Sequence, residues 1–237
     1  MFRQIKFKHL LKFSYVRALP GSKCEIDNTA VLSRCHIIVS SNGALTIEEG
    51  AKLSNVVIYV GSGSVYIGKH SIIGSRFHRV EINIREGETY IADHCRLSPL
   101  RIWCRFGGTF TVNSYTNVND YSEIRCDEKV AIGCFCRISY NVRIWDTNTH
   151  TLLPKDKRRE VTIRNFPGFG LEEIKPKTSP TIIGDDCWIG EYSAISKGVT
   201  IGDQSVIGYG TFLTNKNIPK GSLVVNPKEV SIIKRDI

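Results

Sequence analysis

A histidine in the second half of the chain is the residue best placed to do chemistry. His150 ends the run Trp145-Asp146-Thr147-Asn148-Thr149-His150, at the start of a polar stretch from 146 to 180. An imidazole is the side chain best suited to taking a proton from a hydroxyl group near neutral pH. Asp146 has two interpretations that stay open: its carboxylate could fix the tautomer of His150, or it could cap the loop.

The polar stretch interrupts a repeat. On its C-terminal side, aliphatic residues recur at exact six-residue spacing, namely Ile183, Ile189, Ile195, Ile201, Ile207 and Leu213. A helix repeats its apolar face about every 3.6 residues and a two-faced strand every 2, so a period of six fits neither. It fits a triangular solenoid in which each hexad is a short strand plus a turn, and three hexads make one coil.

The same spacing appears upstream in groups of three that start roughly one coil apart. We place these groups at Ile26, Leu32, Ile38; Ile47, Leu53, Tyr59; Ile67, Ile73, Arg79; Ile91, Leu97, Trp103; Val112, Val118, Ile124; and Ile132, Ile138, Ile144. Arg79 and Trp103 break the apolar rule, which predicts irregular early coils. A long insert in such a column has no packing role, so we expect function at 146–180; a solvated loop is the plainer alternative.

Composition predicts a folded, soluble protein. The chain has 237 residues, of which 41% are hydrophobic and 23% charged, close to ordinary globular usage. No stretch reaches the roughly 20 apolar residues of a membrane span. Lys12 and Arg17 break the N-terminal apolar run, unlike in a signal peptide. We therefore expect a cytoplasmic protein whose eight cysteines are reduced thiols.

The net charge of +9 lies at the two ends of the chain. Residues 1–23 carry six basic side chains and no acidic one, and basic and acidic side chains are equal in number over 24–215. This distribution does not predict a nucleic-acid-binding surface. We divide the chain into a basic, helical N-terminal cap over 1–24, a solenoid over 25–215 with an insert at 146–180, and a basic tail over 216–237. The cap would cover the first coil, and it is also compatible with lying on the inner face of an anionic membrane.

The C-terminal repeats resemble a known family. The hexads of 183–213, within the block IIGDDCWIGEYSAISKGVTIGDQSVIGYGTFLTNKNIP, are similar to those of the left-handed β-helix, hexapeptide-repeat acyltransferases. Among these are the maltose and galactoside acetyltransferases and polysaccharide O-acetyltransferases. The resemblance implies an all-β, left-handed parallel β-helix. It is only repeat-level over 25–145 and does not cover 1–24.

The resemblance also implies a general base and a donor site. It makes His150 the base and places acetyl-CoA in a groove between neighbouring subunits of a homotrimer. Trp188 would lie beside the reacting centre, with corner packing as an equal alternative. The pantetheine and adenine ends would be lined by Gly190, Tyr209, Gly210 and Thr214. Glu229 stands where the family has a basic residue, so the phosphate contact would fall to Lys228, Lys234 or Arg235.

On the acceptor side, Asn119 sits where maltose and galactoside acetyltransferases hold the sugar with an Asn. At a coil corner, an Asn is an equally good left-handed turn residue. An Asp that those enzymes carry nearby aligns with Cys126 here, which predicts a different acceptor. We add Trp145 to the acceptor-binding residues.

We therefore expect an acetyl-CoA-dependent O-acetyltransferase that acts on a sugar hydroxyl in bacterial surface polysaccharide biosynthesis, by direct attack and without a metal. N-acetylation of an amino sugar, free or nucleotide-linked, is the alternative. A structural solenoid would need neither the insert nor the Trp-Ile-Gly motif. A zinc-dependent carbonic anhydrase of this shape would need three histidines at a spacing that the chain lacks. An acyl-enzyme is disfavoured because packing already explains three cysteines at small hexad positions, Cys95, Cys136 and Cys187.

Overall fold

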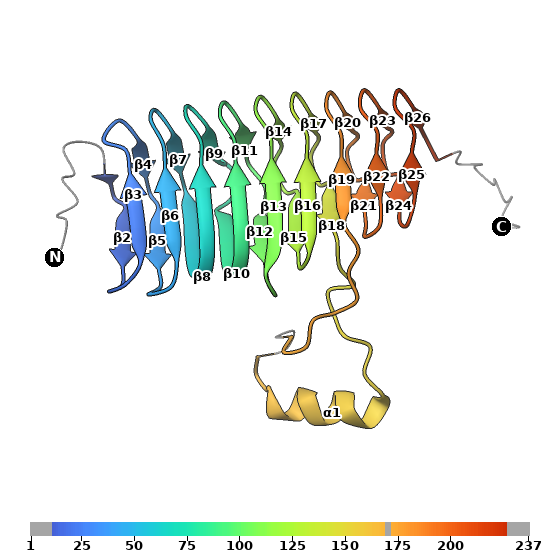
Figure 1. The fold of residues 1–237 in the computed structure, drawn as a ribbon, viewed down its shortest axis with the longest axis horizontal. Helices are drawn as coiled ribbons and strands as arrows, with labels where there is room; N and C mark the ends of the chain where they lie inside the picture. Colours follow the sequence, from blue (N-terminus) through green and yellow to red (C-terminus); the bar gives the residue numbers. More distant parts are fainter. Residues whose placement is uncertain (1–10, 169–171, 227–237) are drawn as a thin grey trace, which may run out of the picture.

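The computed structural model describes residues 11–168 and 172–226, and they form a parallel β-solenoid (Figure 1). One side of the column, the first face, is a 10-stranded parallel sheet. Its strands, in sheet order, are β1 (Leu11–Lys12), β4 (Val31–Ser33), β7 (Lys52–Ser54), β9 (Ile72–Gly74), β11 (Arg96–Leu97), β14 (Asn117–Val118), β17 (Arg137–Ile138), β20 (Trp188–Ile189), β23 (Val206–Ile207) and β26 (Leu223–Val224).

The other two sides belong to one 16-stranded sheet, because β8 (Val56–Ile67) and β10 (Val80–Ile91) run across both of them. The second face contains the first halves of these two strands with β2 (Tyr15–Ala18), β5 (His36–Val39), β12 (Arg101–Cys104), β15 (Glu123–Cys126), β18 (Arg143–Trp145), β21 (Ala194–Ile195) and β24 (Phe212–Leu213). The third face contains their second halves with β3 (Lys23–Ile26), β6 (Ala44–Ile47), β13 (Gly108–Val112), β16 (Lys129–Ile132), β19 (Thr181–Ile183), β22 (Thr200–Ile201) and β25 (Asn217–Ile218).

The interior of the column is a stack of aliphatic side chains. Along the second face, Ile124, Ile144, Ile195 and Leu213 are successive register partners. The six aliphatic residues predicted to point inward from the C-terminal hexads are all buried. Removing apolar surface from water is the main driving force for folding, so the repeat stabilises the column at every coil.

The predicted phase is wrong by one residue in the early coils. On the second face, Ile37 and Val39 point inward instead of Ile38, and Ile58 and Val60 instead of Tyr59. Trp103 likewise lies outward between two buried neighbours. These strands have four or more residues, so alternation sets the inward positions, and corners of variable length shift the hexad count.

The ends of the column also differ from the expectation. The helix predicted over 1–24 is wrong for residues 11–24, where β1, β2 and the start of β3 pair with the next coil. At the other end, β25 and β26 continue the solenoid to residue 224, past the boundary expected at 215. Residues 1–10 and the predicted phosphate contacts Lys228, Lys234 and Arg235 lie outside the described residues. Nothing helical in the described part of the chain is long and apolar enough to cross a membrane.

The insert leaves the column between β18 and β19, where the sequence predicts it. It contains α1 (Lys155–Arg164), which lies at the far end of the insert, away from the solenoid (Figure 1). No residue of α1 is buried in this single chain. The insert is therefore an arm that projects from the corner between the second and third faces.

Candidate active site in the insert

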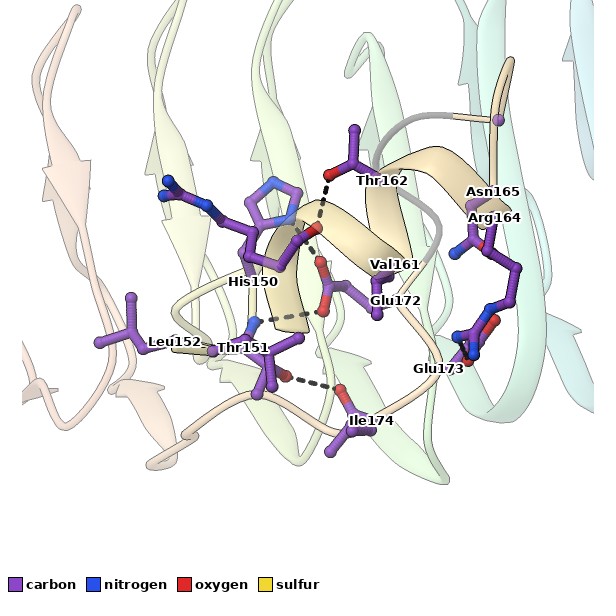
Figure 2. Close-up of a pocket in the computed structure, with 13 residues that line it drawn as sticks. His150, Thr151, Leu152, Val161, Thr162, Arg164, Asn165, Glu172, Glu173 and Ile174 are labelled. Atoms are coloured by element: carbon purple, nitrogen blue, oxygen red, sulfur yellow. Dashed lines mark hydrogen bonds and ion pairs between the residues drawn. The ribbon is translucent and has the colours of Figure 1, made fainter. Parts of the chain in front are cut away.

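The insert encloses a cavity of about 460 Å³ (Figure 2). Its walls come from both legs of the insert and from α1, and consist of His150, Thr151, Leu152, Leu153, Arg158, Val161, Thr162, Arg164, Asn165, Gly168, Glu172, Glu173 and Ile174. The candidate base predicted from the sequence thus lines a pocket that the insert makes by itself.

Glu172 holds the imidazole of His150. Nδ1 of His150 lies 2.6 Å from Oε1 of Glu172, and Oε2 accepts a hydrogen bond from the backbone N–H of Thr151 at 3.1 Å (Figure 2). The carboxylate therefore favours the tautomer with the proton on Nδ1, which leaves the lone pair of Nε2 to accept a proton. The His150 side chain is 58% exposed and that of Glu172 17%, so the base is open to a reactant while its partner is shielded.

Asp146 has the capping role and not the orienting one. Its buried carboxylate accepts hydrogen bonds from the backbone N–H groups of Asp127, Glu128 and Lys129 at 2.9, 2.7 and 2.6 Å. Burial raises the pKa of Asp146, and the three N–H groups act against that shift. The expectation that Asp146 fixes the tautomer of His150 is corrected: its oxygens are committed to a corner of the preceding coil, and Glu172 makes the contact.

A buried ion pair holds the insert at the point where it leaves the column. Arg105 donates two hydrogen bonds to Asp127, from Nε at 2.9 Å and from Nη2 at 2.7 Å. Nη2 also reaches the carbonyl oxygen of Thr149 at 3.3 Å, and Thr147 Oγ1 donates to Asp127 at 2.7 Å. Thr149, the residue before His150, is therefore bonded to the column, which fixes the position of the His150 backbone.

The two legs of the insert are joined as they leave the column. Thr147 and Thr178 form an antiparallel bridge, and the N–H of Asn148 donates to the carbonyl of Lys177 at 3.0 Å. The N–H of Ser179 donates to the carbonyl of Asp146 at 2.9 Å. These bonds hold the two ends of the insert together at the corner where it leaves the column.

The residues predicted to bind the donor lie elsewhere on the column. Trp188 is on the first face, 54% exposed, and its Nε1–H donates to Ser139 Oγ at 3.2 Å. Tyr209 is 61% exposed at the following corner, where its ring meets Tyr192 edge-on. Gly210 lies in the same corner, whereas Thr214 follows the second face. Within one chain, then, His150 and Trp188 sit on different sides of the column.

Packing between neighbouring coils explains why residue 190 is a glycine. A Cβ at this position would lie 2.7 Å from the backbone N of Tyr209 and 2.8 Å from the backbone C of Gly208. Neighbouring coils approach too closely here for any side chain. Gly190 itself is buried, and Tyr209 is exposed beside it.

The two predicted acceptor residues also differ in setting. Asn119 Oδ1 accepts a hydrogen bond from Asn117 Nδ2 at 2.8 Å, and the left-handed turn conformation in this corner belongs to Tyr121, not to Asn119. The alternative turn role for Asn119 is therefore wrong. Trp145 lies on the outer side of the second face, with the Arg125 guanidinium 4.9 Å from its ring centroid.

The cysteines predicted to be packing residues are buried. Cys95, Cys136 and Cys187 are each at most 1% exposed. Burial raises the pKa of Cys95 to about 11, which disfavours its thiolate. The hydrogen bond with Cys136 lowers the pKa of Cys187 to about 7, but the Cys187 side chain is buried away from any reactant. In the residues that the structure describes, no three His, Cys, Asp or Glu side chains gather as a metal site would require.

Comparison with known proteins places the similarity in the C-terminal coils. Residues 180–215 match the family described as bacterial transferase hexapeptide (six repeats), which confirms the resemblance for these repeats. The galactoside O-acetyltransferase of Escherichia coli is 55% identical over 40 residues, covering 17% of this chain and 19% of that protein. The chloramphenicol acetyltransferase of Agrobacterium fabrum is 28% identical over 109 residues, covering 42% of this chain and 49% of that protein. The matched segments thus span about half or less of these relatives.

A solved structure supports the fold over nearly the whole chain. The polysialic acid O-acetyltransferase OatWY superposes with a TM-score of 0.58 at 18% identity, covering 92% of this chain and 95% of that one. The architecture of this chain is accordingly the left-handed parallel β-helix that the repeats predict.

Proposed function

From a column that carries bacterial transferase hexapeptide repeats at residues 180–215 and has the fold of a solved O-acetyltransferase, we propose an acyltransferase that moves an acetyl group from acetyl-CoA to a sugar hydroxyl. The observation that carries the proposal is the His150–Glu172 pair at the cavity of the insert. A base with a free Nε2 and a shielded carboxylate behind it suits proton removal from a hydroxyl.

The pair would act in one direct transfer. Nε2 of His150 takes the hydroxyl proton while the sugar oxygen bonds to the acetyl carbonyl carbon. Glu172 stabilises the imidazolium that forms, since its carboxylate already accepts the Nδ1–H. As the carbon–sulfur bond breaks, the imidazolium returns the proton to the leaving sulfur. Acetyl-CoA, when bound, supplies the acetyl group already activated as a thioester.

The donor edge is the strip formed by the exposed Trp188 and Tyr209 together with the buried Gly190. The half-exposed rings of Trp188 and Tyr209 flank a backbone that carries no side chain at Gly190. Such an edge fits an extended pantetheine arm through backbone hydrogen bonds and ring contacts. These residues would hold the donor, and Gly210 would extend the strip.

A homotrimer would bring the donor edge to the base. His150 and Trp188 occupy different sides of one column, so a site containing both needs the donor edge of a second copy. Apolar side chains on the insert support this: Leu152 is 85% exposed, Ile163 78% and Ile174 56% in the single chain. A neighbouring column would cover them. Light scattering should then give three times the 26.6 kDa chain mass.

The setting we propose is the cytoplasm of a bacterium that builds surface polysaccharide. All eight cysteines are free thiols, as in a reducing compartment. One relative is named a galactoside O-acetyltransferase, and the superposed structure a polysialic acid O-acetyltransferase, which supports a sugar acceptor.

The deciding experiment is thiol release. Purified protein is incubated with acetyl-CoA and matched hydroxyl and amino sugars, and free CoA thiol is followed with a chromogenic disulfide. We expect release with hydroxyl acceptors that His150→Ala removes. Release with amino sugars alone would establish N-acetylation instead, and failure to bind CoA in calorimetry would overturn the enzymatic proposal.

A further inference from the structure

The second face carries an outer stack of aromatic and basic side chains across three coils. Trp103, Arg125 and Trp145 are successive register partners in β12, β15 and β18. The Arg125 Cζ lies 5.3 Å from the ring centroid of Trp103 and 4.9 Å from that of Trp145. The guanidinium is therefore held between two indole rings.

Two more arginines flank this stack. Arg101 places its Cζ 4.7 Å from the Trp103 centroid. Arg101, Glu123 and Arg143 form the neighbouring column of register partners. We call the whole set the guanidinium face, which consists of Arg101, Trp103, Glu123, Arg125, Arg143 and Trp145.

The acidic groups on this face do not occupy all the hydrogen-bond donors of the arginines. Glu123 Oε1 accepts the Nε–H of Arg125 and lies 4.0 Å from Nε of Arg101. Glu81, one coil earlier, accepts the Nε1–H of Trp103 at 3.1 Å. In the described part of the chain, no hydrogen bond from an Nη atom of Arg101, Arg125 or Arg143 is found. The terminal N–H groups of these arginines are therefore not hydrogen-bonded to Glu81 or Glu123.

Stacking prepares these groups for an anion. A guanidinium fixed between rings loses little freedom on binding, and its planar N–H groups match a carboxylate or phosphate in bidentate fashion. The Arg125 side chain is 21% exposed and that of Arg101 30%, so they are partly desolvated and still reachable. Partial burial strengthens such a pairing relative to a fully exposed one.

The guanidinium face runs to the root of the insert. Trp145 is the last residue of β18, and the backbone N–H of the next residue, Asp146, donates to the carbonyl of Arg125 at 3.3 Å. His150 follows four residues later, and Arg105 ties Thr149 to the same corner. An extended chain bound along the second face would therefore lead toward the candidate base.

We propose that the guanidinium face binds the acidic groups of the acceptor, and that the acceptor is an acidic glycan. This inference rests on the proposed function and names its substrate class. The acceptor is held by charge and geometry at Arg101, Arg125 and Arg143, on the three coils that lead up to the insert. The phosphates of CoA present similar chemistry, so the test separates the two sources.

Binding is measured without turnover, in the His150→Ala protein, by calorimetry. The probes are hexagalacturonate, which carries a carboxylate on each ring, and neutral maltohexaose of the same length. We expect at least a 10-fold preference for hexagalacturonate, and a loss of about 10-fold in its affinity on adding Arg125→Ala. Arg125→Lys keeps the charge but not the planar guanidinium, so it should lose part of the affinity for hexagalacturonate. Arg96→Ala, an exposed arginine on the first face, is the matched control and should lose none.

Two results would overturn the inference. One is equal affinity for the acidic and neutral probes with folded protein, as judged by circular dichroism. The other is an Arg125→Ala protein whose affinity falls for CoA but not for hexagalacturonate, which would assign the face to the donor. Thiol release from acetyl-CoA with a neutral sugar, unchanged by Arg125→Ala, would leave the proposed function standing while these results removed the acidic acceptor.

Discussion

Nδ1 of His150 lies 2.6 Å from Oε1 of Glu172, and both residues belong to the same insert. The pair therefore does not depend on the register of the coils. A second hydrogen bond, from the N–H of Thr151 to the other oxygen of Glu172, fixes the carboxylate against the residue next to the base. Both members of the pair that we propose as the proton acceptor thus lie within the insert.

Replacing His150 by alanine should reduce kcat for acetyl transfer by about 10²- to 10⁴-fold, the range typical of a lost general base. Thiol release at saturating acetyl-CoA measures it. His36→Ala, at an exposed position early on the second face, should leave kcat unchanged. An equal loss in both variants would point to general damage instead of chemistry.

Glu172→Gln should lower kcat by about 10-fold or more with little change in KM, because an amide keeps the shape but cannot stabilise an imidazolium. Glu160→Gln, at an exposed position of α1 that is not among the walls of the cavity, is the matched control and should leave kcat unchanged. Full activity of Glu172→Gln would show that the carboxylate has no part in the reaction.

Asp146→Ala should cost stability. Three backbone N–H groups would lose their acceptor in a buried corner, and each unpartnered buried group costs about 1–3 kcal/mol. Urea unfolding should report a loss of about 3 kcal/mol or more. The Glu172→Gln protein should unfold like the unmodified chain, so the two acidic residues separate cleanly into structural and chemical roles.

Gly190→Ala should also destabilise the column, because the added Cβ would overlap the backbone of the next coil at 2.7 Å. Overpacking of this kind costs typically about 1–3 kcal/mol. Thermal unfolding followed by circular dichroism measures the effect. An unchanged melting temperature would mean that the coils can separate locally, and would return Gly190 to the donor site as its main explanation.

The sequence predicts the late coils well and the early ones less well, for a physical reason. Ile189 to Leu213 follow the six-residue spacing because each two-residue strand there has one inward position. Tyr59 keeps the six-residue spacing, but longer strands alternate, and its neighbours Ile58 and Val60 occupy the core instead. Trp103, which breaks the apolar rule, likewise lies outward. The N-terminal helix failed similarly, since pairing of Leu11 with Leu32 and Tyr15 with His36 outweighs local preference.

His150 could be singled out from sequence because it stands where the repeat ends. Glu172 could not, because its contact with His150 depends on how the 21 intervening residues fold back, and no periodicity governs that path. The weak clue was a carboxylate within the same insert. Asp146 is nearer to His150 along the chain, but its carboxylate accepts hydrogen bonds from the backbone N–H groups at a corner of the previous coil.

The bridge between Thr147 and Thr178 joins the two ends of the insert where it leaves the column. The described residues between these two threonines make their contacts largely within the insert, whereas the chain before Thr147 repeats from coil to coil. A chimaera that takes the segment between those two threonines from a relative should therefore keep the unfolding behaviour of its host. It should also keep the host's preference for acidic acceptors, because the guanidinium face belongs to the column. Such proteins can diversify their chemistry by swapping one module while the scaffold remains as it is.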